Sequence, residues 1–137
     1  MDQRVNMTDI LIETTSEEGF ASRSIVGEFE LKLDADGEEG PQTNPTLVAT
    51  YAGCWIPAFR LAAQQRDVED LGRIEIDAEA DLDDDDDLEA IRFKIKTEAD
   101  LDEKKEEIVE RAHEICHVDA ALREDLRADV VVEDDVF

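Results

Sequence analysis

The residues with the clearest capacity for chemistry lie near the C-terminal end of the chain. Residues 113–117 read His-Glu-Ile-Cys-His. Two histidines four residues apart share one helical face, where they can bind zinc beside a general-base glutamate, as in metalloproteases. His113, Cys116 and His117 are also a candidate metal-ligand set without proteolysis, which Cys54 could complete from elsewhere in the fold.

Proteolysis is the less favoured interpretation of this segment. A zinc protease needs a third protein ligand and a cleft for its substrate. Only 20 residues follow His117, with Glu124 and Glu133 as candidate third ligands. That is too little chain for a second lobe, so proteolysis is not expected.

The two cysteines of the sequence, Cys54 and Cys116, form a second candidate site. Their separation excludes C-x-x-C redox and zinc motifs, but two cysteines on the buried faces of two helices can meet in space. Each could instead be a small core side chain. Gly53 and Pro57 favour a reactive role for Cys54. Gly53 removes a side chain beside the sulfur, and Pro57 leaves a backbone carbonyl without its helical donor.

The composition limits the partners and the compartment. The chain has 39 acidic and 14 basic residues, a net charge of −25. No cationic surface for nucleic acid or an anionic membrane is expected, and molar salt would screen the self-repulsion, as in a halophile. Without a long apolar run or an N-terminal signal region, the protein is expected to be soluble and cytoplasmic, where two cysteines are more often catalytic or metal-binding than a structural bridge.

The hydrophobic periodicity predicts a single α+β domain over residues 1–137 with the element order βββ-α-ββ-α-β. The second helix is expected to be capped by Asp102. The acidic run 83–87 lies in a predicted hairpin loop, where solvation is the expected role and a calcium site is the alternative. The predicted strands are 7–15, 20–27, 28–34, 72–80, 89–99 and 127–133, and the predicted central helix, apolar nearly all round, is 44–66.

Two motifs resemble the family of osmotically inducible protein C and organic hydroperoxide resistance protein, the OsmC/Ohr family. Residues 40–55, GPQTNPTLVATYAGCW, are similar to the Gly-Pro loop and alanine-rich helix that lead to the family's first cysteine. Residues 116–125, CHVDAALRED, are similar to the second motif through Cys116, Val118 and Leu122. The resemblance implies curved antiparallel sheets packed on a buried central helix, an intertwined homodimer and, with the acidic composition, a halophilic member.

The resemblance also implies a chemistry. Cys54 would be the peroxidatic residue that attacks an organic hydroperoxide or hydrogen peroxide, and Cys116 the resolving one, through an intramolecular disulfide that an external dithiol reduces. No cofactor is implied. Arg23 is the candidate for the arginine that activates the first cysteine, and His117, which replaces the proline of the second motif, is a candidate for proton transfer. Pro45 stands where many members have a glutamate.

Two other functions on the same fold stay open at this point. One is a non-catalytic metal-binding protein that uses His113, Cys116 and His117. The other is a protein that binds an apolar ligand without catalysis and would keep its function in a Cys54→Ser variant.

Overall fold

The computed structural model describes residues 8–137. The element order agrees with the predicted βββ-α-ββ-α-β, with a short helix and a 3-10 turn added before the last strand. The described part of the chain divides into two compact units, one within residues 1–46 and the other over residues 47–137. The elements are β1 (Glu13–Thr15), β2 (Ala21–Val26), β3 (Phe29–Asp34), α1 (Thr43–Gln64), β4 (Ile74–Leu82), β5 (Leu88–Thr97), α2 (Lys105–Ile115), α3 (His117–Ala121), η2 (Glu124–Leu126) and β6 (Asp129–Glu133).

The N-terminal unit contains the predicted three-stranded antiparallel meander, in the order β1-β2-β3. Val26 pairs with Phe29, so two residues close the β2–β3 hairpin. The first of them is Gly27, whose φ of 62° suits this position. Strand β1 is shorter than the predicted 7–15, and Met7 lies outside the described residues.

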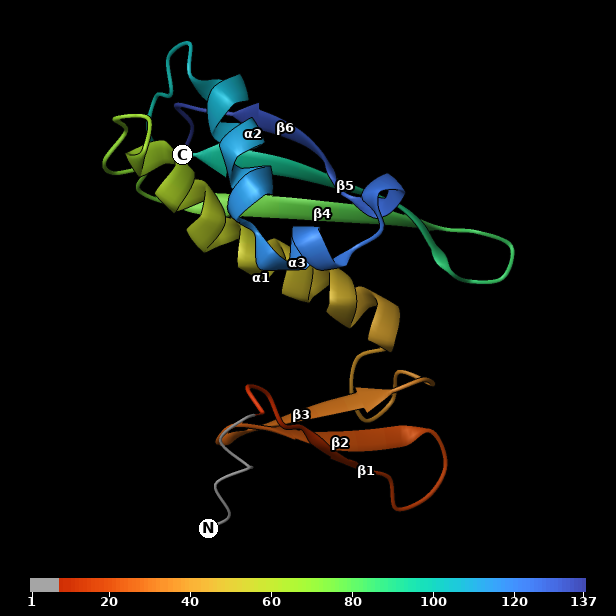
Figure 1. The fold of residues 1–137 in the computed structure, drawn as a ribbon. Helices are drawn as coiled ribbons and strands as arrows, with labels where there is room; N and C mark the ends of the chain where they lie inside the picture. Colours follow the sequence, from red (N-terminus) through yellow and green to blue (C-terminus); the bar gives the residue numbers. More distant parts are fainter. Residues whose placement is uncertain (1–7) are drawn as a thin grey trace. The chain divides into compact units, whose positions relative to one another are not determined.

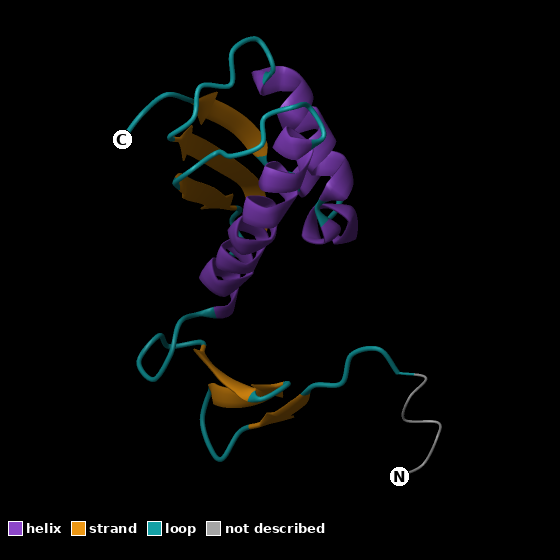
Figure 2. Cartoon of the chain, turned by 90° about the vertical axis from the view of Figure 1, so that its left-hand side faces the viewer, coloured by secondary structure: helices purple, strands orange, loops and turns teal. Residues whose placement is uncertain are grey.

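The second unit is a three-stranded sheet, β4-β5-β6, with all the helices of the unit on one face (Figures 1 and 2). The register pairs apolar residues of the two predicted strands 72–80 and 89–99, with Ile76 opposite Ile95 and Ala78 opposite Phe93. From Ile91 to Thr97 burial alternates along β5, because Ile91, Phe93 and Ile95 are buried while the residues between them are more exposed.

The expectation of purely antiparallel sheets is wrong for the last strand. β6 pairs parallel with β5, with Phe93 opposite Val130 and Ile95 opposite Val132. Parallel neighbours need a crossover connection of a dozen or more residues, usually helical. Here α2, α3 and η2 make up that crossover and return the chain to the end of the sheet at which β5 began.

The central helix is buried on one side, while the opposite side, which the sequence predicts to be apolar as well, is exposed in the single chain. Tyr51, Trp55 and Phe59 are fully buried, whereas Leu47 and Leu61 are exposed. The buried side packs on β5, where the rings of Tyr51 and Phe93 lie 4.8 Å apart. The core that joins α1 to the sheet and α2 includes Val48, Ala58, Ala62, Ala63, Leu71, Ile91, Ile95, Leu101, Ile108 and Ala112.

Helix α2 does not begin at the predicted cap. It starts at Lys105, its N-cap residue is Lys104, and no side chain caps it. Asp102 has a φ of 54°, a left-handed conformation that Asp tolerates in turns but that differs from an N-cap backbone. Among the described residues, no helix is long and apolar enough to cross a membrane.

Candidate active site

Cys54 lies in the middle of α1 and is half-buried. Its neighbour Gly53 is exposed and Trp55 on the other side is fully buried, so the cysteine sits at the boundary between the solvent side and the core side of the helix. Pro57 lies inside the same helix, as predicted. A thiol at such a boundary can be reached by a small molecule while its neighbours stay ordered.

Cys116 separates two helices and is 1% exposed. It is the C-cap of α2, where its N–H donates to the carbonyl of Ala112 at 2.9 Å, and also the N-cap of α3. Its φ and ψ of −66° and 119° are extended, which ends α2. Its sulfur accepts the backbone N–H of Asp119 at 3.4 Å, the contact expected of an N-cap side chain.

The two cysteines lie near each other although 61 residues separate them in the sequence. Both are free thiols. Burial raises the pKa of the Cys116 thiol from 9.0 to about 11, and the neighbouring Cys54 thiol adds to this shift. Cys116 is therefore a neutral thiol at neutral pH, which leaves the half-buried Cys54 as the sulfur better placed to meet a reagent from solvent.

A buried polar network adjoins Cys116. The Tyr51 hydroxyl donates to Oδ1 of Asp119, a carboxylate that is 3% exposed, and accepts the N–H of Ala128 at 2.9 Å. His113 Nδ1 lies 3.1 Å from both carboxylate oxygens. Arg127 Nε donates to the backbone carbonyl of Asp119 at 2.9 Å. Burial raises the pKa of Tyr51, so it stays a hydroxyl donor.

Sequence reasoning missed the residues at the centre of this network. Asp119 follows Val118 in a short apolar stretch and has no motif of its own, while Tyr51 lies within the apolar stretch of the predicted helix 44–66. The one available signal was an aspartate at the third position after a cysteine that could cap a helix. Its burial and its partner Tyr51, 68 residues away, come only from the fold.

The metal-ligand set predicted from His-Glu-Ile-Cys-His is not assembled. His113 Nδ1 faces Asp119 and its ring packs edge-on against Trp55, with centroids 4.8 Å apart. Its remaining exposed side lines a groove of about 400 Å³ with Val130 and Val132. His117 is exposed. Among residues 8–137, the ligand atoms of His113, Cys116 and His117 do not lie close enough together to bind one ion. The structure therefore does not support the metal-binding alternative.

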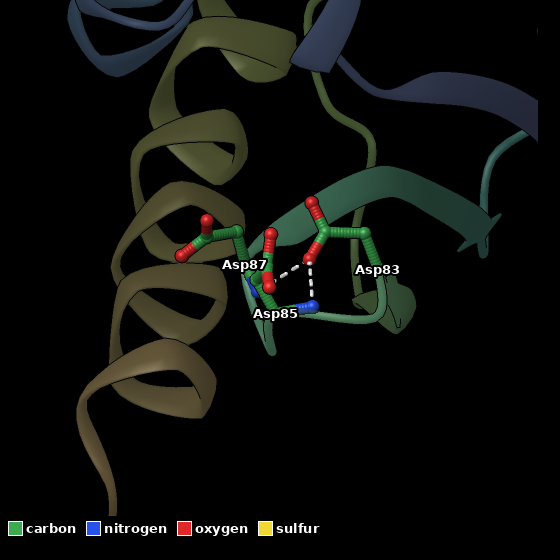
Figure 3. A group of neighbouring side chains, drawn as sticks. All are labelled: Asp83, Asp85 and Asp87. Atoms are coloured by element: carbon green, nitrogen blue, oxygen red, sulfur yellow. Dashed lines mark hydrogen bonds between the residues drawn. The ribbon is translucent and has the colours of Figure 1, made fainter.

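One cluster of three aspartates does bring its carboxylates together in the part of the chain that the structure describes. The carboxylates of Asp83, Asp85 and Asp87 lie within 4.8 Å of one another in the β4–β5 hairpin loop (Figure 3). Asp83 Oδ1 accepts the backbone N–H of Asp85 at 2.9 Å and of Asp87 at 3.0 Å. These bonds are those of an aspartate-stabilised turn, which accounts for the arrangement without an ion.

Arg23 belongs to the N-terminal unit, whereas both cysteines belong to the second. It lies on β2, where its side chain is half exposed, and its Nε is 3.9 Å from Oε2 of Glu30 on the adjacent strand. Exposed ion pairs of this kind contribute little to stability. Its role towards Cys54 stays a prediction.

Comparisons with known proteins identify relatives over nearly the whole chain. The model of the family described as OsmC-like protein matches residues 35–131. A protein from the halophile Haloferax volcanii, described as uncharacterized, is 54% identical over 132 residues, 96% of this chain and all of that protein.

Solved structures have the same fold. An OsmC-like protein from Mycoplasma pneumoniae superposes with a TM-score of 0.75 at 16% identity, over 93% of this chain and 97% of that one. The organic hydroperoxide resistance protein OhrB of Bacillus subtilis gives a TM-score of 0.66 at 24% identity, over 90% of this chain and 98% of that one.

Proposed function

The chain belongs to the OsmC-like protein family, which includes hydroperoxide-resistance proteins, and we propose that it is a thiol-dependent peroxidase acting on organic hydroperoxides or hydrogen peroxide. The observation that carries the proposal is the pair of free cysteines, one half-buried and one buried, brought together from α1 and the end of α2. Cys54 is the proposed peroxidatic residue and Cys116 the resolving one.

The proposed reaction has three steps. The Cys54 thiolate attacks one oxygen of the peroxide, the O–O bond breaks, and the products are a sulfenic acid and an alcohol or water. The Cys116 thiol then attacks the Cys54 sulfur, forming a disulfide and releasing water that carries the sulfenic oxygen. Finally, an external dithiol reduces the disulfide and is itself oxidised to a disulfide.

The environments of the two sulfurs support this order. Peroxide can approach Cys54 at the helix surface beside exposed Gly53. Cys116 is shielded and protonated, so it is a poor first nucleophile. A buried second thiol beside the first also limits oxidation of Cys54 to irreversible acids, because it traps the sulfenic acid. Exposed His117, next to Cys116, is the proposed proton-transfer residue of the resolving step.

The test is a single-turnover reaction of reduced protein with one equivalent of cumene hydroperoxide at molar KCl, followed by mass spectrometry. Wild type should lose both thiols and gain one Cys54–Cys116 disulfide. Cys54→Ser should leave the peroxide unconsumed, and Cys116→Ser should consume it but stop at the sulfenic acid. Arg23→Gln should slow peroxide consumption and leave the subsequent disulfide step unchanged.

Two outcomes would contradict the proposal. If both wild-type thiols stay free, the protein is not a two-cysteine peroxidase. If Cys54→Ser consumes peroxide as fast as wild type, Cys54 is not the peroxidatic residue and the proposed reaction is wrong.

We also propose that the working form is a homodimer. The N-terminal unit exposes large apolar side chains, including Ile10 (79%), Leu11 (75%), Phe20 (74%) and Phe29 (77%). Apolar groups gathered on one small unit are typical of an interface. Sedimentation equilibrium at molar KCl should give twice the 15.4 kDa mass of the chain, and a monomer mass at micromolar concentration would contradict this.

A further inference from the structure

The buried carboxylate of Asp119 is bound by side chains from both helices that carry the cysteines. Tyr51 donates to it from α1, His113 contacts it from α2, and Asp119 itself lies on α3. Tyr51 is three residues before Cys54, and His113 is three residues before Cys116. Asp119 therefore links the two helices at matching positions, about one turn before each thiol.

A packing role alone does not explain this arrangement. Burying a carboxylate is unfavourable unless hydrogen-bond donors compensate for the lost water, and apolar side chains of similar volume usually stabilise a core at least as well. Here the side chains that face the carboxylate come from two separate helices, with the Arg127 guanidinium 3.9 Å from Oδ2 as an additional positive charge. Such a group restricts how the helices can move relative to each other, because any shift leaves a buried polar atom without its partner.

The same residue also contacts the sulfur directly. The backbone N–H of Asp119 donates to Cys116 Sγ at 3.4 Å, and Arg127 holds the Asp119 backbone carbonyl at 2.9 Å. The Asp119 side chain thus contacts α1 and α2, and the Asp119 backbone N–H binds the Cys116 sulfur. Disulfide formation depends strongly on such ordering, because it needs the two Cα atoms within about 4.4–6.8 Å and a defined dihedral angle.

We propose that Asp119 is the positioning residue for the Cys54–Cys116 disulfide, holding α1 and α2 through Tyr51 and His113 so that the two sulfurs are in register. This assignment rests on the proposed function, in which that disulfide completes the peroxidase reaction. Positioning acts by raising the effective concentration of one thiol at the other, which a dithiol redox buffer measures directly.

The experiment is the equilibrium of the reduced protein with mixtures of reduced and oxidised dithiothreitol at molar KCl, with disulfide quantified by alkylation and mass spectrometry. Asp119→Ala should lower the equilibrium constant for the Cys54–Cys116 disulfide by about tenfold, the effect of losing roughly one buried hydrogen bond. Asp119→Asn keeps an acceptor oxygen and should fall between Asp119→Ala and wild type. Tyr51→Phe is a second way to break the link if Asp119→Ala does not fold.

The matched control is Asp134→Asn. Asp134 also anchors α2, by accepting the N–H of Leu101 at 2.7 Å and binding Lys105 at 2.8 Å, but the cysteines are at the other end of that helix. The control should lower the free energy of unfolding and leave the disulfide equilibrium as in wild type. Equal equilibrium constants in wild type, control and both Asp119 variants would overturn the proposal, as would an equal loss in the control.

This readout separates the inference from the proposed function. The dithiol buffer forms the disulfide without peroxide, so the effect of Asp119 is measured even if Cys54 proves unreactive towards hydroperoxides. If the peroxidase is confirmed, Asp119→Ala should also slow disulfide closure after peroxide addition while leaving the first step, loss of peroxide, at the wild-type rate.

Discussion

At the scale of single residues, the Cys116 side chain takes part in two interactions, one with the backbone of α3 and one with the Cys54 thiol. Its sulfur caps α3 through the N–H of Asp119, and its burial keeps it a thiol beside Cys54. The two features act in opposite directions on the pKa of Cys116, because the accepted N–H favours the thiolate while the larger effect, burial, favours the neutral thiol. A thiolate there would lack the water that stabilises its charge.

The raised pKa of Cys116 predicts a loss of stability at alkaline pH. Since the folded pKa of about 11 lies above the unfolded value of 9.0, the stabilising contribution is complete below pH 9 and is lost as the pH rises through 11, by at most about 3 kcal/mol. Reduced wild type, followed by urea unfolding from pH 8 to 11, should lose more stability than Cys116→Ala.

The Cys116→Ala variant is the control for this measurement, because it retains every other titrating group, including Tyr51, whose pKa is raised by burial. Parallel losses of stability in the two proteins would show that the Cys116 thiol is not the group responsible.

At the scale of elements, α1 contains two residues that disfavour helix, Gly53 and Pro57. Close packing does not explain Gly53, because a Cβ added there meets no atom within 4 Å among the described residues. Gly40 is the contrast, since its Cβ would lie 2.7 Å from the Lys32 carbonyl oxygen. Gly53 thus leaves open space beside Cys54, whereas Gly40 permits the close approach of two backbone segments.

Gly53→Ala should therefore raise the free energy of unfolding by up to about 1 kcal/mol, the difference in helix propensity between alanine and glycine. Gly40→Ala, the same substitution at a crowded site, should be destabilising. Thermal unfolding at molar KCl measures both. A loss of stability in Gly53→Ala would mean that a surface outside this chain covers the residue.

At the scale of the whole molecule, the charge of −25 is only partly balanced by local pairs. On the outer face of the second sheet, acids on β4 lie opposite bases on β5. The pairs are Glu75 with Lys96, Asp77 with Lys94 and Glu79 with Arg92. The chain has too few bases to extend this pattern over its surface, so most of the carboxylates repel one another.

Salt should consequently stabilise the protein strongly. The Debye length falls from about 10 Å at 0.1 M to about 3 Å at 1 M, which removes repulsion between carboxylates that are not in contact. The melting temperature should rise continuously as KCl increases from 0.1 to 2 M. Sucrose at matched osmolarity is the control for exclusion effects, and an unchanged melting temperature would contradict the halophilic interpretation.

Local pattern in the sequence was enough to predict much of this molecule. Alternation over residues 89–99 predicted β5, and the apolar stretch 44–66 predicted α1. The order of elements followed in the same way, whereas the roles of the two cysteines were implied by the resemblance to the OsmC/Ohr family. The elements depend on residues within one or two turns of each other, and such short-range periodicity is directly readable.

The tertiary structure alone decided what depends on distant residues. The parallel pairing of β6, the exposure of Leu47 and Leu61, and the proximity of Cys54 to Cys116 all follow from how helices pack on the sheet. Asp119 is the clearest case. No local pattern distinguishes a solvated aspartate from one whose partner is a tyrosine 68 residues away, because burial is a property of the assembled core and not of the sequence around the residue.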